Sequence, residues 1–229
     1  MNTVDKEGSK FLSEMIIKNR FLKNLNLNYN NLDIGSSFII DSLDSNESLE
    51  DLSLSYVGLN LDSIQKLFEN LKTNKSLKRI DISYNLIEET TYNSKLFDFL
   101  SFNNTIEEQS LDGIGIKNYF PSLCRTLQNQ NSIKILSLSA NDLDDQGITL
   151  FSDSLKINKK LQEINLSYNS ITNRGANFVL KALNDNKTLL KINLEYNQIN
   201  STIITKINTV LECNIEWSSL SPKLFFGFF

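Results

Sequence analysis

Apolar residues recur along this chain in two alternating spacings. In one stretch they stand three and then two positions apart, at Leu161, Ile164 and Leu166, with polar residues between them. That spacing predicts a short strand with one buried face. Further along, the spacing changes to three and four positions, which predicts a helix with one buried side. The apolar residues of that helix are Ala176, Val179, Leu180 and Leu183.

The unit of strand, loop and helix recurs seven times, with a period of about 28 residues. Each copy opens with the skeleton Leu-x-x-Leu-x-Leu-x-x-Asn-x-Leu, in which isoleucine also takes the leucine positions. The copies begin at Leu22, Leu49, Leu77, Ile106, Ile133, Leu161 and Leu189. A fixed period of this length predicts a solenoid, in which each copy buries its apolar face against its neighbours.

Two spacings decide the shape of such a solenoid. Neighbouring strands lie about 4.8 Å apart, whereas packed helices need about 8–10 Å. A stack with strands on one side and helices on the other must therefore bend. We expect an α/β fold in the form of a curved horseshoe arc, with a parallel β-sheet on the concave side and α-helices on the convex side.

The skeleton and its period resemble those of the leucine-rich repeat family, and the length is similar to that of its ribonuclease-inhibitor-like subclass. The resemblance implies a full helix after every strand. It also implies that the asparagine at the ninth position of the skeleton is buried and hydrogen-bonds backbone groups of neighbouring turns. An amide suits this role because it carries both donors and acceptors. We call these ladder asparagines, and they are Asn30, Asn85, Asn141, Asn169 and Asn197.

A second asparagine stands three residues before most copies. We expect it to end each helix in a left-handed backbone conformation, which asparagine accepts better than other non-glycine residues. We call these the cap asparagines, and they are Asn19, Asn46, Asn74, Asn103, Asn158 and Asn186.

The repeat pattern divides the chain into three parts. Residues 1–21 are expected to form an N-terminal capping helix, and residues 22–216 the seven repeats. Residues 217–229 are expected to form a degenerate eighth repeat or an aromatic C-terminal cap, because a solenoid needs atypical ends.

The start of the eighth copy rests on two residues. Trp217 and Leu220 fall 28 residues after Leu189 and Ile192, but the copy then meets Pro222. For the tail beyond it, packing over the last helix, contact with a partner or membrane, and continuation into a longer solenoid are all alternatives. Its aromatic residues are Phe225, Phe226, Phe228 and Phe229.

The fourth copy is irregular. Gln109 takes an apolar strand position, and Ile114 replaces the ladder asparagine between Gly113 and Gly115. Val57 replaces the ladder asparagine of the second copy. These departures indicate either drift with a local bulge or a joint or contact site in the middle of the solenoid.

The concave face is the candidate binding surface. Its exposed strand positions are expected to carry small, polar and slightly acidic side chains, which favour a basic partner weakly. Serines are expected there too, among them Ser55, Ser83, Ser139 and Ser167. The charged candidates for partner binding are Asp51, Arg79, Asp81, Asp112, Glu163 and Glu195.

Five of the seven tyrosines stand immediately before the ladder position. A common register should align them along one rim, where tyrosine contributes strongly to interfaces because it buries a large area and keeps a hydroxyl. The alternative is that Ser-Tyr-Asn is only the form in which these repeats were copied. We call these residues the tyrosine row: Tyr29, Tyr56, Tyr84, Tyr168 and Tyr196.

Composition argues against most chemistry. The chain has no histidine, which excludes Ser-His and Cys-His catalysis and histidine-based metal sites. No phosphate-binding loop occurs, and Gly113-Ile-Gly115 lacks the third glycine of a dinucleotide fingerprint. We therefore expect no enzyme activity, no cofactor and no metal.

Charge and hydropathy narrow the partners and the location. The net charge of −4 and the pI near 5.0 provide no basic field for nucleic acid. No apolar run reaches the roughly 18 residues of a membrane span, and none resembles a signal peptide. With only Cys124 and Cys213 present, we expect a cytoplasmic, monomeric protein without disulfide-bonded caps.

Two functions follow from the resemblance. The first is a protein-protein interaction module, a scaffold or recognition domain that binds a partner protein on its concave face. The alternative is a regulator of a small GTPase, since the repeats are also similar to those of Ran GTPase-activating proteins. Arg79 would then be the residue that stabilises phosphoryl-transfer charge. The long acidic tail of those activators is missing from this sequence.

Overall fold

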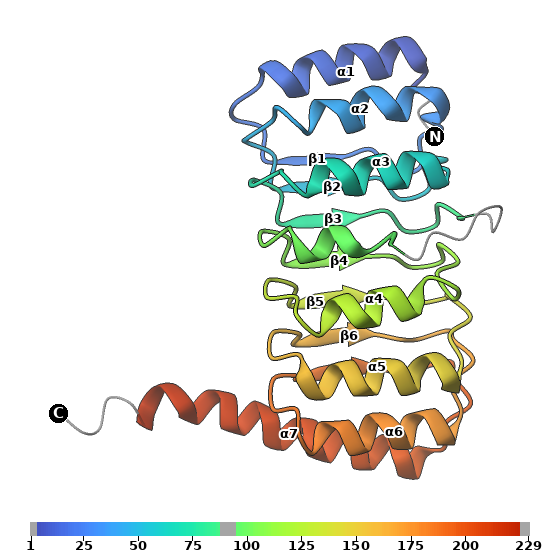
Figure 1. Cartoon of the computed structure of the whole chain (residues 1–229), viewed down its shortest axis with the longest axis vertical. Helices are drawn as coiled ribbons and strands as arrows, with labels where there is room; N and C mark the ends of the chain where they lie inside the picture. The colour runs from blue at the N-terminus through green and yellow to red at the C-terminus, as the bar shows by residue number, and fades with distance from the viewer. Residues whose placement is uncertain (1–3, 88–94, 225–229) are drawn as a thin grey trace.

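Seven short parallel strands form one open sheet, ordered as they occur in the sequence. The computed structural model describes residues 4–87 and 95–224. Figure 1 shows the strands stacked along the long axis of the molecule, with the helices in one layer against them. The strands are β1 (Asn24–Asn26), β2 (Asp51–Ser53), β3 (Arg79–Asp81), β4 (Glu108–Ser110), β5 (Ile135–Ser137), β6 (Glu163–Asn165) and β7 (Lys191–Asn193).

The register of the sheet follows the repeat. Each strand begins two residues after the start of its copy, so every residue pairs with its equivalent in the next copy. Gln109 pairs with Ile80 on one side and with Leu136 on the other, in the same register as the other central residues. The bulge that the irregular fourth copy suggested is therefore absent from β4.

The helices form the second layer. In the third copy the structure describes a 3-10 helix, η2 (Asp98–Ser101), and another, η1 (Asp33–Gly35), precedes α2. Figure 1 places α1 and α7 at opposite ends of the stack. The α-helices among the described residues are α1 (Lys6–Lys18), α2 (Ser36–Ser42), α3 (Leu61–Leu71), α4 (Phe120–Leu127), α5 (Asp145–Ile157), α6 (Asn173–Leu183) and α7 (Ser201–Leu224).

One apolar core runs between the two layers through all seven copies. In the middle of the stack, from β2 to β6, each copy contributes a buried strand residue, such as Ile164, and buried residues of the helix layer, such as Val179 and Leu183. No copy has a closed core of its own, because the apolar face of each unit is covered by the units on either side. The predicted curved α/β solenoid is thus confirmed.

Local sequence fixes where several helices begin. The carboxylate of Asp144 accepts hydrogen bonds from the backbone N–H groups of Gln146 and Gly147 at the start of α5. Asn60 accepts one from Ser63 at the start of α3. Pro121 lies in the first turn of α4, where its missing N–H is not needed for the helical hydrogen bonds.

The cap asparagines do not adopt the left-handed conformation, so that prediction was wrong. Asn19 has φ −82° and Asn158 has φ −63°. In Asn186, Oδ1 instead accepts hydrogen bonds from the N–H groups of Thr188 at 3.0 Å and Leu189 at 2.8 Å. These bonds open the next strand and leave the asparagine in an extended conformation.

The other end of the same amide reaches the preceding copy. Nδ2 of Asn186 donates to the carbonyl oxygens of Leu155 at 2.8 Å and Asn158 at 2.9 Å. The equivalent bonds recur at Asn46, Asn74, Asn103 and Asn158. From Asn46 onward, each cap asparagine therefore starts its own strand and fastens it to the copy before.

Three ladder asparagines, Asn85, Asn141 and Asn169, are buried and bind the preceding copy, as the resemblance implied. Asn30 and Asn197 are only partly buried, and the amide of Asn30 donates within its own copy. Nδ2 of Asn85 donates to Leu54 O at 2.7 Å and to Ile82 O at 2.8 Å, while Oδ1 accepts from Val57 N and Leu59 N. Asn85 therefore binds the backbone of the second copy, which has only Val57 at its own ladder position.

Gln109 is the conspicuous irregularity of the core. Its side chain is 1% exposed, and neither its amide nitrogen nor its amide oxygen has a hydrogen-bond partner among the described residues. A buried amide without partners destabilises a protein, because it loses its hydrogen bonds to water.

The C-terminal end differs from expectation. Trp217 and Leu220, expected to open an eighth copy with a strand, belong to the helix α7. A helix satisfies its own backbone groups, whereas a last strand would leave half of its groups unpaired. The four phenylalanines of the tail lie outside the described residues.

We predict that Asn85→Ala lowers the free energy of unfolding by about 1–3 kcal/mol, because it leaves buried backbone groups of two copies unpaired. Urea denaturation measures the change. Asn30→Ala is the matched control, since the hydrogen bonds of Asn30 among the described residues stay within its own copy. Equal losses for the two variants would contradict the role of Asn85 between copies.

We predict that Gln109→Leu raises the free energy of unfolding by about 1–3 kcal/mol, because it replaces an unpaired buried amide with an apolar side chain of similar size. Gln198→Leu, at an exposed position, is the control and should change stability little. An unchanged or lower midpoint for Gln109→Leu in urea would argue that the amide has a partner or that leucine does not fit.

Candidate protein-binding surface

The strands present a polar face on the side away from the helices. In β2 to β6 the central residue is buried and its two neighbours are partly exposed. Four serines that were expected on this face are buried instead, with exposed fractions between 4% and 6%. They lie where the strand passes into the turn, and neighbouring copies enclose them there. The four are Ser55, Ser83, Ser139 and Ser167.

Two of the predicted charged residues form a cross-strand pair. Nε of Arg79 lies 2.9 Å from Oδ2 of Asp51, across the β2–β3 pairing. The hydrogen bond to Asp51 raises the pKa of Arg79 above its ordinary value. Glu163 pairs in the same way with Lys191 at 3.1 Å. Both pairs are partly exposed, so each contributes little to stability.

Asp112 is held more tightly than the other acidic candidates. Its Oδ1 accepts hydrogen bonds from the Ser137 hydroxyl at 2.6 Å and from Ser139 N at 2.7 Å. Burial nevertheless raises the pKa of Asp112. Asp81 accepts a hydrogen bond from Ser83 N at 2.9 Å, and Glu195 is exposed on the last copy. The acidic candidates therefore spread over the face and form no single cluster.

Glu50 is a charged residue that the sequence analysis did not single out. It precedes β2 and forms ion pairs with Lys23 at 2.8 Å and with Lys78 at 2.6 Å, one on each neighbouring copy. Hydrogen bonds to these two lysines lower the pKa of Glu50 to about 2. The 28-residue period aligns Lys23, Glu50 and Lys78 in adjacent copies, which is a signal that the sequence already contained.

The tyrosine row is brought together in two groups. Tyr29, Tyr56 and Tyr84 follow one another with ring centroids 5.6 Å and 5.5 Å apart. Tyr168 and Tyr196 stack closely, with centroids 4.1 Å apart and planes inclined by 13°. A hydrogen bond with Tyr196 raises the pKa of Tyr168. All five rings are between 46% and 67% exposed.

Every tyrosine of the row has a left-handed backbone, with φ between 54° and 59°. This conformation is unfavourable for a side chain with a Cβ, by roughly 1–2 kcal/mol. The sheet supports it at Tyr29, Tyr56, Tyr84 and Tyr168, whose N–H groups each donate to a carbonyl of the next copy, as Tyr56 N does to Ser83 O at 3.0 Å. The fold thus holds these rings in one orientation.

Two small residues separate the groups. Gly113 with φ 61° and Ala140 with φ 56° occupy the tyrosine position in the fourth and fifth copies. The ring of Tyr84 lies over Gly113, since a Cβ at residue 113 would come within 2.6 Å of Tyr84 Cδ1. Burial near this point also raises the pKa of the Tyr84 hydroxyl.

The described residues form neither a metal-binding cluster nor a membrane-spanning helix. No three or more of their aspartate, glutamate and cysteine side chains gather into a group that could hold a metal ion. None of the helices they form combines the length and apolar character that crossing a membrane requires.

A family model and a curated protein both match this chain. A family model for Leucine Rich repeat matches residues 129–152 and 158–180. NACHT, LRR and PYD domains-containing protein 4E from Mus musculus is 28% identical over 157 residues, which cover 66% of this chain and 16% of the relative. The chain therefore spans about a sixth of the length of that relative.

Two solved structures match this chain at low sequence identity. Leiomodin-1 Actin-Binding Site 2 matches with a TM-score of 0.47 and 14% identity, covering 56% of this chain and 91% of that one. The tropomodulin C-terminal domain of Caenorhabditis elegans matches with a TM-score of 0.36 and 13% identity, covering 93% of this chain and 97% of that one.

We predict that Gly113→Ala destabilises the protein by about 1–2 kcal/mol, because alanine disfavours a positive φ and its Cβ would meet the Tyr84 ring. The loss should be smaller in a Tyr84→Ala background, where only the backbone strain remains. Urea denaturation of the four proteins of this double-mutant cycle gives the coupling. A coupling of zero would show that the ring does not rest on Gly113.

Proposed function

We propose that this chain, as a leucine-rich repeat protein, is a protein-protein interaction module whose concave face and tyrosine row together bind a partner protein. The observation that carries this proposal is the tyrosine row. Five exposed aromatic rings are held in an unfavourable backbone conformation and aligned along one edge of the sheet. Pre-oriented tyrosines bind well, because little conformational entropy remains to be lost on association.

The concave face supports the same function by its charge. Its exposed strand positions carry six carboxylates and two cations, Arg79 and Lys191, which gives this face a formal charge of 2 − 6 = −4. The two cations already pair with Asp51 and Glu163. The unpaired acidic surplus would steer a partner with a basic surface, and would act more on the rate of association than on affinity.

The proposed site combines both features. Asp81 lies in the same copy as Tyr84 and Asp112 in the next copy, and both carboxylates act on the Tyr84 hydroxyl, so an aromatic ring and the acidic face meet at that point of the surface. The partner-binding residues in the proposal are the tyrosine row together with the six charged candidates. A cytosolic, monomeric module of the ribonuclease-inhibitor-like subclass remains the prediction from sequence.

Regulation of a small GTPase has no observation in its favour. An arginine that stabilises phosphoryl-transfer charge must be free to reach the nucleotide. The guanidinium of Arg79 is engaged with Asp51 at 2.9 Å. We therefore propose no second function.

We predict that replacing Tyr56, Tyr84 and Tyr168 with alanine weakens partner binding by about tenfold or more, while the free energy of unfolding changes little. Alanine keeps the positive φ, so the loss is mainly aromatic contact area. A pull-down from native cytosol identifies the captured protein, and titration of that protein against each variant measures the affinity.

A matched control removes a similar apolar surface from the helix layer. Phe11, Leu150 and Ile157 are exposed on α1 and α5, and their triple alanine variant should bind the partner like the wild type. Equal affinity of the tyrosine variant and the wild type for the captured protein would rule out the tyrosine row as the binding surface.

A further inference from the structure

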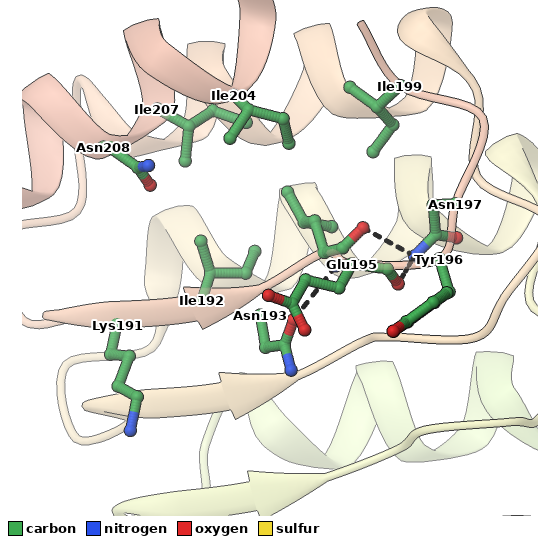
Figure 2. Close-up of a pocket in the computed structure, with 11 residues that line it drawn as sticks. Lys191, Ile192, Asn193, Glu195, Tyr196, Asn197, Ile199, Ile204, Ile207 and Asn208 are labelled. Atoms are coloured by element: carbon green, nitrogen blue, oxygen red, sulfur yellow. Dashed lines mark hydrogen bonds between the residues drawn. The ribbon is translucent and has the colours of Figure 1, made fainter. Parts of the chain in front are cut away.

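The sheet ends on an unpaired edge beside a cavity. β7 is the last strand, and between it and α7 lies a cavity of about 470 Å³. Figure 2 shows Ile192 from the strand and Ile199, Ile204 and Ile207 from the helical side facing this space. The cavity occupies the place where, in every other copy, the next strand and its apolar side chains would pack.

Backbone groups at this edge lack the partners that earlier copies have. Leu166 N donates to Asn193 O at 2.8 Å, and Tyr168 N donates to Glu195 O at 3.0 Å. The equivalent donors of the last copy are Leu194 N and Tyr196 N, and the described residues contain no following strand to accept from them. An open strand edge of this kind is a template for another strand.

A buried asparagine of α7 is only half satisfied. Asn214 lies 28 residues after the cap Asn186 and is fully buried. Its Nδ2 donates to the carbonyls of Leu189 at 2.9 Å and Asn186 at 3.2 Å, but its Oδ1 has no partner among the described residues. In Asn186 that oxygen accepts the two N–H groups that open the next strand.

The residues that follow Asn214 carry the repeat signature. Trp217, Leu220 and Pro222 stand 28 residues after Leu189, Ile192 and Leu194 respectively. In earlier copies the N–H at the position equivalent to Leu194 donates to the next copy, as Leu166 N does to Asn193 O. If Pro222 takes this position in a final strand, the strand lacks only a donor that would have no acceptor. Such a proline suits an edge strand and blocks further pairing.

We propose that residues 215–222 dock on the free edge of β7 as an eighth strand, and that the outer half of α7 is the undocked form of the same segment. Trp217 and Leu220 then fill the cavity, and the N–H groups of Glu216 and Trp217 reach Oδ1 of Asn214. Ser219, Leu220 and Ser221 pair with Lys191, Ile192 and Asn193, in the register of the whole sheet.

The undocked helix leaves apolar groups in water. Trp217 is 65% exposed and Ile215 is 49% exposed in α7, whereas Leu189, the equivalent of Trp217, is fully buried. Proline inside a helix also removes one helical hydrogen bond and its ring clashes with a carbonyl of the preceding turn. Burial of the indole and the pairing of Asn214 favour the docked strand, while the backbone hydrogen bonds of the helix oppose it.

A disulfide trap tests the register. With Cys213→Ser, the pair Asn193→Cys and Ser221→Cys should cross-link within one chain under mild oxidation, because these residues become strand neighbours. In the undocked helix, residue 221 lies about 21 Å along the axis beyond Ile207. The control pair Asn193→Cys and Ser218→Cys is displaced by three residues, about 10 Å along the strand, and should cross-link at least several-fold more slowly.

Trp217 is the one tryptophan of the chain and reports the same event. In the cross-linked protein its emission should move to shorter wavelength, and its quenching by acrylamide should fall several-fold relative to the reduced Pro222→Ala variant. Pro222→Ala should also slow formation of the 193–221 disulfide several-fold, since alanine favours the helix. Ser218→Ala is the control substitution and should leave the rate unchanged.

Three outcomes would overturn the proposal. The first is that the 193–221 pair cross-links no faster than the 193–218 pair. The second is a cross-link between two chains, detected by mass, which would mean that the edge takes its strand from a second copy. The third is that trapping leaves the emission of Trp217 unchanged. None of these outcomes depends on whether the tyrosine row binds a partner.

Discussion

Amide side chains that bridge consecutive copies are the interaction on which this solenoid depends. A single asparagine such as Asn186 supplies acceptors to the strand that follows it and donors to carbonyls of the copy before it. The strands are only three residues long, so backbone pairing alone leaves much of each turn unpaired. Because all these contacts lie between nearest neighbours, the structure extends by repetition and needs no long-range packing.

The same repetition produces the proposed binding surface. Once the asparagines fix the register, any residue type repeated at one position forms a row along the stack. Tyrosine before the ladder position gives the tyrosine row, and lysine and glutamate around the strands give ion pairs such as Lys78 with Glu50. The row is interrupted where Gly113 and Ala140 replace tyrosine. The surface therefore has three tyrosine rings toward its N-terminal end and two toward its C-terminal end.

At the C-terminal end of the solenoid the repeat pattern continues, but there is no further copy to complete its hydrogen bonds. In the middle of the stack every copy has a neighbour that completes its hydrogen bonds and covers its apolar face. At the C-terminus Asn214 repeats the cap position, but helical residues follow it where a strand would normally begin. The repeat pattern after Asn214 favours a strand, whereas these residues are helical in α7. While they are helical, the edge of β7 stays unpaired and the cavity beside it stays open.

The sequence alone determined the number of copies, the parallel order and register of the strands, and the buried ladder, because a strict period specifies which residues become neighbours. It also placed the tyrosines in one register, but not in two stacked groups. The second role of the cap asparagines was decided by tertiary structure, since from Asn46 onward their amides also donate to carbonyls of the preceding copy. The burial of Ser139, the unpaired amide of Gln109 and the course of α7 through Trp217 likewise depended on what neighbouring copies provide or fail to provide, which no local pattern records.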